Sequence, residues 1–164
     1  SIITPTVAMS AFLALDLWAP FGLQMPTRLD LVGKRLRGWP ELGQAVSTLE
    51  RGISSRPFLA SDRYQIASEL AFYVEANPRV FNANFGRRMN QYDLWGGWED
   101  LKGRDGLFVT YGAAQPPEEL RAAFQQVEQI RVVPITHRGQ HVRDFSIYLG
   151  RGFLGFTPHP FSGY

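Results

Sequence analysis

The sequence predicts an α/β fold, in which a layered, mixed β-sheet carries helices on both faces and ends in an antiparallel hairpin. Segments with the periodicity of amphipathic helices alternate along the chain with short apolar runs of strand length. The 11 prolines and 16 glycines favour many short elements over a few long helices. Two strand-like segments on either side of residues 137–140 supply the closing hairpin.

The domain is expected to span residues 37–150, between an N-terminal arm and linker (1–36) and an irregular Gly/Pro-rich tail (151–164). In the arm, Val7 to Leu23 is apolar but interrupted by Asp16 and Pro20, whereas a bilayer span needs about 20 apolar residues. It is interpreted as the end of a membrane span, an interfacial segment or an arm packed on the domain. The linker carries a basic group: Arg28, Lys34, Arg35 and Arg37.

The first half of the domain predicts two helices that alternate with short strands. Pro40 suits a first helical turn, and apolar residues recur at helical spacing up to Gly52, which predicts a left-handed stop there. A buried strand is expected over residues 57–60. Asp62 is the predicted N-cap of the next helix, with Gln65 as its capping partner. That helix has an inward stripe of Ile66, Leu70, Tyr73 and Val74 and ends before Pro78, where a strand over residues 79–82 follows.

The second half predicts three strands and one helix. Residues 106–112 form an apolar run between glycines, which is typical of a strand covered on both faces. Residues 116–124 predict a helix opened by two prolines, with Glu118 and Glu119 at its positive end and Leu120, Ala123 and Phe124 inward. Residues 127–136 and 141–149 are the strands of the final hairpin.

The amino-acid composition excludes several classes of function. The net charge of +2, without a basic stripe inside the domain, does not fit a nucleic-acid binder. Cysteine is absent, which removes disulfides, thiolate metal sites and cysteine nucleophiles. No cofactor is expected. At 164 residues the chain is long enough for a core without such staples.

Three motifs have weaker chemical interpretations. Residues 150–155, GRGFLG, match the glycine pattern of a phosphate loop, but Pro158 and Pro160 bar the helix that such a loop needs. His137, His141 and His159 are all the histidines, so a zinc site would need a carboxylate such as Asp144, and solvated hairpin histidines are the simpler interpretation. Asp62 and Glu69 have the spacing of an acid and base pair, but capping explains Asp62 and solvent exposure explains Glu69.

The loop over residues 84–98, NFGRRMNQYDLWGGW, is the best candidate for binding. Basic guanidinium groups grip phosphate or carboxylate, aromatic faces stack on sugars or lipid headgroups, and polar side chains fix orientation. The alternative is a structural loop whose aromatic rings fold over the sheet edge. The candidate binding residues are Arg87, Arg88, Asn90, Gln91, Tyr92, Asp93 and Trp95.

Three segments carry a resemblance to a known family: RLRGWPE (35–41), ASDRYQIASELAFYV (60–74) and NQYDLW (90–95). They resemble the C-terminal soluble region of bacterial glycosyltransferase family 39 proteins. That group includes protein mannosyltransferases and aminoarabinose transferases. The residues that carry the resemblance are Gly38 with Trp39, Tyr64, Phe72 with Tyr73, and Gln91 to Trp95. The match spans about residues 28–111.

The resemblance implies a polytopic enzyme that moves a sugar from a polyprenyl-phosphate donor to a lipid or protein acceptor. The chain would be its extracytoplasmic (periplasmic) accessory domain, with the membrane portion of the same polypeptide as partner and no catalytic residue of its own. The basic linker instead matches a cytoplasmic flank by the positive-inside rule. Two alternatives from other classes are a free-standing small-molecule or nucleotide-binding α/β domain and a structural interaction module.

Overall fold

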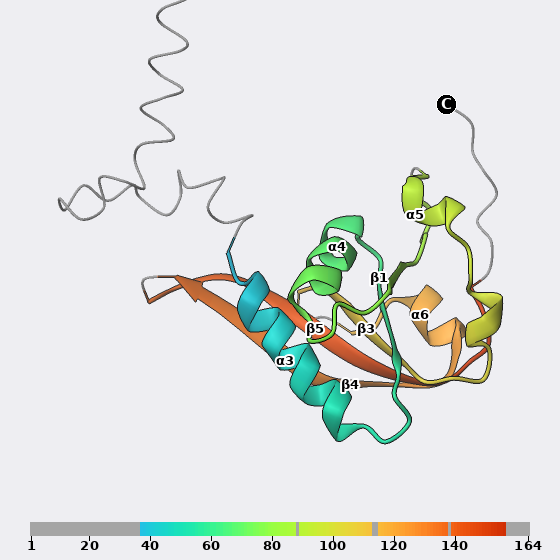
Figure 1. Ribbon diagram of the computed structural model, residues 1–164. Coiled ribbons are helices and arrows are strands. Elements are labelled where there is room, and N and C mark those ends of the chain that lie inside the picture. Colours follow the sequence, from blue (N-terminus) through green and yellow to red (C-terminus); the bar gives the residue numbers. More distant parts are fainter. Residues whose placement is uncertain (1–36, 88, 113–114, 138, 157–164) are drawn as a thin grey trace, which may run out of the picture. The chain divides into compact units, whose positions relative to one another are not determined.

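The computed structural model describes residues 37–87, 89–112, 115–137 and 139–156. The chain divides into two units between Arg37 and Gly38, and all described elements belong to the second. In chain order they are α3 (Trp39–Gly52), β1 (Phe58–Ser61), α4 (Tyr64–Tyr73), β2 (Val80–Asn82), α5 (Gln91–Leu94), the 3-10 helix η2 (Glu99–Leu101), β3 (Gly106–Tyr111), α6 (Glu118–Ala122), β4 (Phe124–His137) and β5 (Gln140–Phe153) (Figure 1). The alternation confirms the predicted α/β class.

The strands form one mixed sheet in the order β2-β1-β3-β5-β4. Strand β1 pairs in parallel with both β2 and β3, and β5 pairs antiparallel with β3 and β4. The hairpin closes with His137 opposite Gln140. The predicted mixed sheet with a C-terminal antiparallel hairpin is therefore confirmed.

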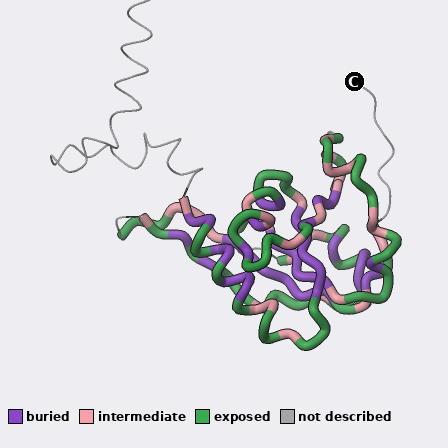
Figure 2. The backbone as a smooth tube through the Cα atoms, in the orientation of Figure 1, coloured by how far each residue is buried: buried purple, intermediate pink, exposed green. Residues whose placement is uncertain are grey.

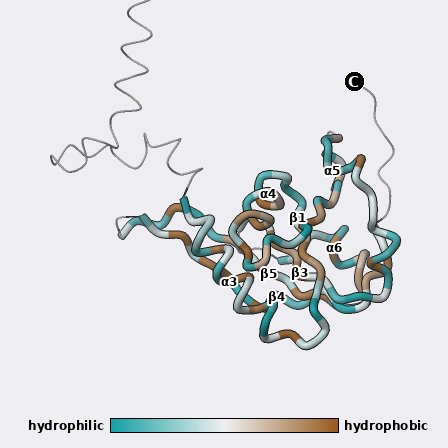
Figure 3. Tube along the Cα trace, in the orientation of Figure 1, coloured by the Kyte–Doolittle hydropathy of each residue, from teal (hydrophilic) through white to brown (hydrophobic). Residues whose placement is uncertain are grey.

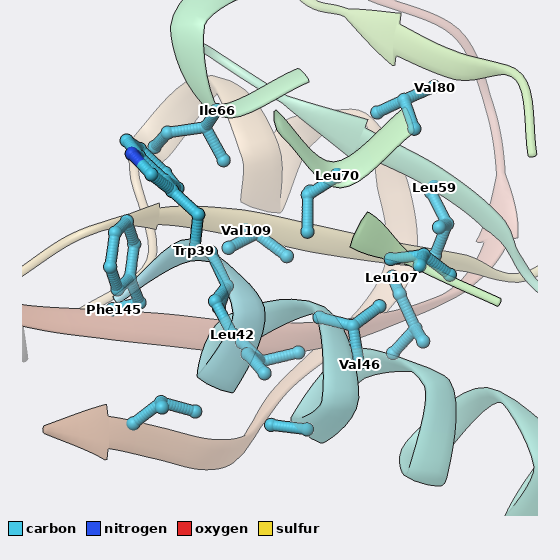
Figure 4. Close-up of a cluster of buried hydrophobic side chains, with 14 of the residues drawn as sticks. Trp39, Leu42, Val46, Leu59, Ile66, Leu70, Val80, Leu107, Val109 and Phe145 are labelled. Carbon is cyan, nitrogen blue, oxygen red and sulfur yellow. The ribbon is translucent and has the colours of Figure 1, made fainter. Parts of the chain in front are cut away.

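Helices α3 and α4 cover one face of the sheet. The inward stripe of α3 places Trp39, Leu42 and Val46 against sheet side chains that occupy every second strand position (Figure 4). Ile66 and Leu70 of α4 extend the same layer. The sheet contributes Leu59, Val80, Leu107, Val109, Val133, Ile135, Phe145, Ile147 and Leu149. Nearly all of these side chains are aliphatic.

Helices α6 and η2 cover the opposite face, through Leu120 and Leu101. This layer is aromatic, because the alternate strand positions carry Phe58, Phe108 and Tyr148, and Phe124 and Phe153 join them. Figure 2 shows the buried positions along the central strands. Helices therefore lie on both faces, as predicted.

The aromatic face explains two glycines. Gly106 and Gly150 are paired across β3 and β5, and the ring of Phe124 lies over both. A Cβ atom at Gly150 would stand 2.5 Å from that ring, and one at Gly106 would stand 3.0 Å from it. Close ring packing, rather than backbone freedom, accounts for glycine at these positions.

Three local predictions were wrong. Gly52 is the last residue of α3 but has no positive φ, and the chain leaves the helix through the extended residue Ile53. Arg63, not Asp62, is the N-cap of α4, and it makes no side-chain capping bond. Its N–H group donates to the hydroxyl of Ser61 at 3.1 Å. Tyr73, predicted inward, is 38% exposed.

The exposure of Tyr73 has a packing cause. A Cβ atom at Gly43 of α3 would stand 2.6 Å from the Tyr73 backbone, so the two helices touch there through main chain. The core position is filled instead by Val74, which is 2% exposed.

The C-terminal boundary differs from the prediction. Strand β5 continues to Phe153, three residues beyond the predicted domain end at 150. Residues 157–164 of the predicted tail and the apolar segment from Val7 to Leu23 lie outside the described residues. None of the helices in the described ranges has the length and apolarity to cross a bilayer.

Candidate functional site: the α5 loop and the outer aromatic surface

Helix α5 is short, and its own side chains hold it in place. The Asn90 side chain accepts a hydrogen bond from the Tyr92 N–H group at 2.9 Å, while Asp93 accepts one from the Asn90 N–H group at 2.7 Å. This reciprocal capping satisfies backbone donors that a four-residue helix leaves open. Capping and tertiary contacts therefore maintain a helix too short to be stable alone.

A polar network ties α5 to the carboxyl ends of β1 and β2. The guanidinium of Arg87 donates to both oxygens of Asp93, at 2.8 and 3.2 Å, and to the side-chain oxygen of Asn82. Asn82 is 3% exposed, and its amide donates to the Ser61 carbonyl at 2.9 Å. Asn90 also donates to Asn82, at 3.3 Å. The structure therefore brings Arg87, Asn90 and Asp93 together in a network that faces the protein.

The remaining candidate residues of the loop lie further out. The hydroxyl of Tyr92 is 2.9 Å from the Ser68 hydroxyl on α4, and its ring lies 4.8 Å from the ring of Trp95, centroid to centroid. Trp95 is 56% exposed, and Gln91 is exposed as well. Arg88 lies outside the described residues.

Trp98, at the end of the loop, turns inward. Its ring lies 4.9 to 6.3 Å from the rings of four phenylalanines on the aromatic face: Phe58, Phe81, Phe153 and Phe156. The expectation that the loop folds aromatic rings over the sheet edge therefore describes Trp98, whereas Trp95 fits the binding interpretation.

Arg79 connects the end of α5 to the end of α4. Its guanidinium donates to the carbonyls of Trp95 and Gly96, at 3.1 and 2.8 Å, and stacks on the Phe81 ring at 4.6 Å. Two residues earlier, the Asn77 amide donates to the Phe72 carbonyl of α4 at 2.8 Å. The two helix ends are thus held on the same side of the molecule.

Large apolar side chains are exposed along these two helices. We call this set the outer aromatic surface, and it consists of Tyr64, Phe72, Tyr73, Met89, Leu94 and Trp95. Of the other large apolar side chains in the described ranges, only Tyr111, Val132 and Leu154 are comparably exposed. Figure 3 shows hydrophobic positions on α4 and beside α5 among hydrophilic neighbours.

Sequence reasoning missed the α4 half of this surface and Arg79. A signal was present, since Tyr64, Ser68 and Phe72 are spaced four apart and share one helix face. That row lies opposite the buried row of Ile66 and Leu70. Apolar residues on both rows conceal which one faces solvent.

The other motifs show structural roles. Gly150, Arg151 and Gly152 belong to β5, so GRGFLG does not form a phosphate loop, and no helix follows it within the described residues. The Gly152 N–H group donates to Asp105 at 3.1 Å, and Arg151 pairs with the same carboxylate at 3.7 Å.

The histidine and carboxylate candidates do not form a metal site within the described residues. His141 is 2.8 Å from Asp144, and among the described residues no three His, Cys, Asp or Glu side chains gather as metal ligands would. His159 lies outside that set. Asp62 pairs with Arg63 at 3.3 Å, and burial raises the pKa of Glu69 above its usual value.

Comparison of the chain with protein-family models, curated proteins and solved structures found no match.

Proposed function

We propose that the chain is the extracytoplasmic accessory domain of an integral-membrane glycosyltransferase of the family 39 type. The parent enzyme would transfer a sugar from a polyprenyl-phosphate donor to a lipid or protein acceptor. Its catalytic groups would lie in the membrane portion of the same polypeptide. The proposal is supported by the resemblance of residues 35–41, 60–74 and 90–95 to that family.

One structural observation carries the proposal for the site. The segments that bear the resemblance are the first turn of α3, the whole of α4 and the capped helix α5, and the last two present the outer aromatic surface. A Tyr92 and Trp95 pair, fixed by the network of Arg87 and Asp93, offers flat faces to a sugar or a headgroup. Gln91 is exposed beside them and can hydrogen-bond a hydroxyl.

The role proposed for this pair is to position the donor or acceptor headgroup near the catalytic groups. Misplacing a substrate by about 1 Å is enough to lower a rate strongly. The domain would thus contribute to transfer without chemistry of its own.

Sugar transfer by the parent protein tests the proposal. In reconstituted vesicles, replacement of Tyr92 and Trp95 with Ala is expected to lower kcat/KM by about tenfold or more, the effect of losing about 1.4 kcal/mol of binding. The control is Leu154→Ala, which removes an exposed apolar side chain outside the surface. Full transfer by the double variant, with normal assembly, would contradict the proposal.

A further inference from the structure

We infer that the outer aromatic surface docks on the interface of an anionic lipid bilayer. The inference deepens the proposed function and rests on it, because the parent protein would hold the domain beside a membrane. It adds a partner that the resemblance does not name, the lipid surface itself, and a set of side chains that contact it.

Side-chain contacts link α4 to α5. They form a closed path from α4 to α5 and back: Ser68 to Tyr92, Tyr92 to Trp95, Trp95 to Arg79, and then along the chain to Asn77, which bonds the end of α4. Phe72 and Trp95 therefore lie on two elements that these contacts hold together.

The exposed side chains of this surface suit a bilayer interface. Phe72 and Leu94 are each 69% exposed, which leaves most of two large apolar groups in contact with solvent. Tyr64, Tyr73 and Trp95 are amphipathic rings, the kind enriched at the level of lipid headgroups. A bilayer interface accepts both kinds at once, since apolar groups insert and the polar edges of the rings stay hydrated.

The charge around the surface favours anionic lipid. Arg79 lies within the contact path and makes no ion pair with a carboxylate in the part of the chain that the structure describes. The acids near the surface are otherwise engaged: Glu75 pairs with Arg51 at 2.6 Å, and Asp93 with Arg87 at 2.8 Å. Asp62, just before α4, pairs with Arg63 at 3.3 Å, and Glu69 on α4 is half-buried. Its raised pKa makes its charge easier to neutralise.

Charge also disfavours a second copy as the occupant. In a two-fold symmetric dimer the same patch faces itself. Its acids Glu75 and Asp93 are already paired with Arg51 and Arg87, so a second copy offers Arg79 little opposite charge. An anionic lipid headgroup supplies the opposite charge instead. Clusters of Lys and Arg near membranes are attracted in this way.

Vesicle binding of the full 164-residue chain tests the inference. The probes are vesicles of equal parts phosphatidylcholine and phosphatidylglycerol and vesicles of phosphatidylcholine alone. Phe72→Asp and Leu94→Asp together are expected to lower the partition coefficient about tenfold or more, because charged groups resist burial in the interface. The matched control carries Val132→Asp and Leu154→Asp, which place the same charges on exposed apolar sites outside the surface. The control should bind as the parent chain does.

Arg79→Gln measures the electrostatic contribution of Arg79 to vesicle binding. It should weaken binding to the anionic vesicles more than binding to phosphatidylcholine, since the loss of the Trp95 and Gly96 contacts affects both vesicle types. All variants keep residues 1–36, so a difference between them cannot come from the apolar segment there. Unfolding curves confirm that each variant is folded.

Equal partition coefficients of the Phe72→Asp, Leu94→Asp variant and the control would overturn the inference. A change of oligomeric state in that variant, without a change in vesicle binding, would overturn it as well. Failure here leaves the proposed function standing if the Tyr92 and Trp95 variant still loses sugar transfer. Conversely, vesicle binding that depends on Phe72 and Leu94, with transfer unaffected by the Tyr92 and Trp95 variant, would support docking and contradict the transferase role.

Discussion

Trp95 and Trp98 lie three residues apart in the connection between β2 and β3 and have opposite surroundings. Trp98 packs against four phenylalanine rings of the aromatic face, whereas the ring of Trp95 contacts the tilted ring of Tyr92 and is 56% exposed. One aromatic residue of this loop completes the core, and the other leaves it. Aromatic residues therefore have two roles in this chain, packing in the core and exposure at the surface. Only the surroundings of each residue distinguish the two roles.

The same contrast extends beyond the loop. Phe153 is 1% exposed in the aromatic face, and Phe72 is 69% exposed in the outer aromatic surface. The inner set fills volume between the sheet and its short helices, so its members stabilise the fold. The outer set leaves its apolar area in water, which is expected of a surface that meets a partner.

The largest expected effect separates these two sets by stability. Phe153→Ala should lower the free energy of unfolding by about 3 to 5 kcal/mol, because it removes a buried ring and leaves a cavity. Phe72→Ala should change it by no more than about 0.5 kcal/mol, as an exposed substitution does. Urea unfolding of both variants measures the difference. Similar losses in the two variants would show that the surface is part of the core.

A medium effect tests whether the polar network supports the surface. Asp93→Ala removes the partner of Arg87 and one arm of the capping box, so it should cost about 1 to 3 kcal/mol in unfolding free energy. Glu99→Ala breaks the exposed pair with Lys102, where the side chains are 82% and 54% exposed, and should cost about 0 to 1 kcal/mol. Chemical unfolding of the two variants compares these costs. Equal values would mean that the network is no more than a surface ion pair.

The smallest expected effect is on the free energy of unfolding and involves Glu50 of α3, a carboxylate close to Glu75. Burial, and then the charge of Glu75, raise the pKa of Glu50. The folded state therefore holds this proton at pH values where the unfolded chain has lost it, so the stability contribution of Glu50 falls as the pH rises from about 4.5 through the raised pKa. Glu50→Gln should raise stability at neutral pH, by about 0.5 kcal/mol at most, and have no effect at low pH.

Thermal unfolding across this pH range, with Glu118→Gln as control, measures the effect. Glu118 lies in the first turn of α6, where the helix dipole favours a negative charge, so its replacement should lower stability slightly at neutral pH. A loss of stability in Glu50→Gln at neutral pH would mean that the carboxylate stabilises the folded state, the opposite of the expected sign.

Much of the fold could be predicted because its signals are local. Strand β3 is a nearly continuous apolar run between glycines, and the β4 and β5 hairpin is two long strands around one turn. Details that depend on distant partners were missed. Arg63 occupies the N-cap of α4 in place of Asp62, with its N–H group bonded to Ser61. Gly43 brings α3 against Tyr73, and Tyr73 is exposed.

The candidate site was found only in part for the same reason. The spacing of residues 84–98 marks a polar and aromatic loop, but it does not show which members bond one another. Arg87 meets Asn82 on β2 and Asp93 on α5, and that contact follows from the turn of the chain between them. The α4 half of the surface belongs to a different element, and the spacing of Tyr64, Ser68 and Phe72 does not by itself show that this row faces solvent.

Quenching of tryptophan fluorescence by brominated lipid tests the docking of the outer aromatic surface most directly. Two variants of the full chain retain one tryptophan each, either Trp95 or Trp98, with phenylalanine at the other three positions. On anionic vesicles we expect quenching of Trp95 emission, together with little quenching of Trp98. Equal quenching of the two, or quenching of Trp98 alone, would contradict docking through this surface.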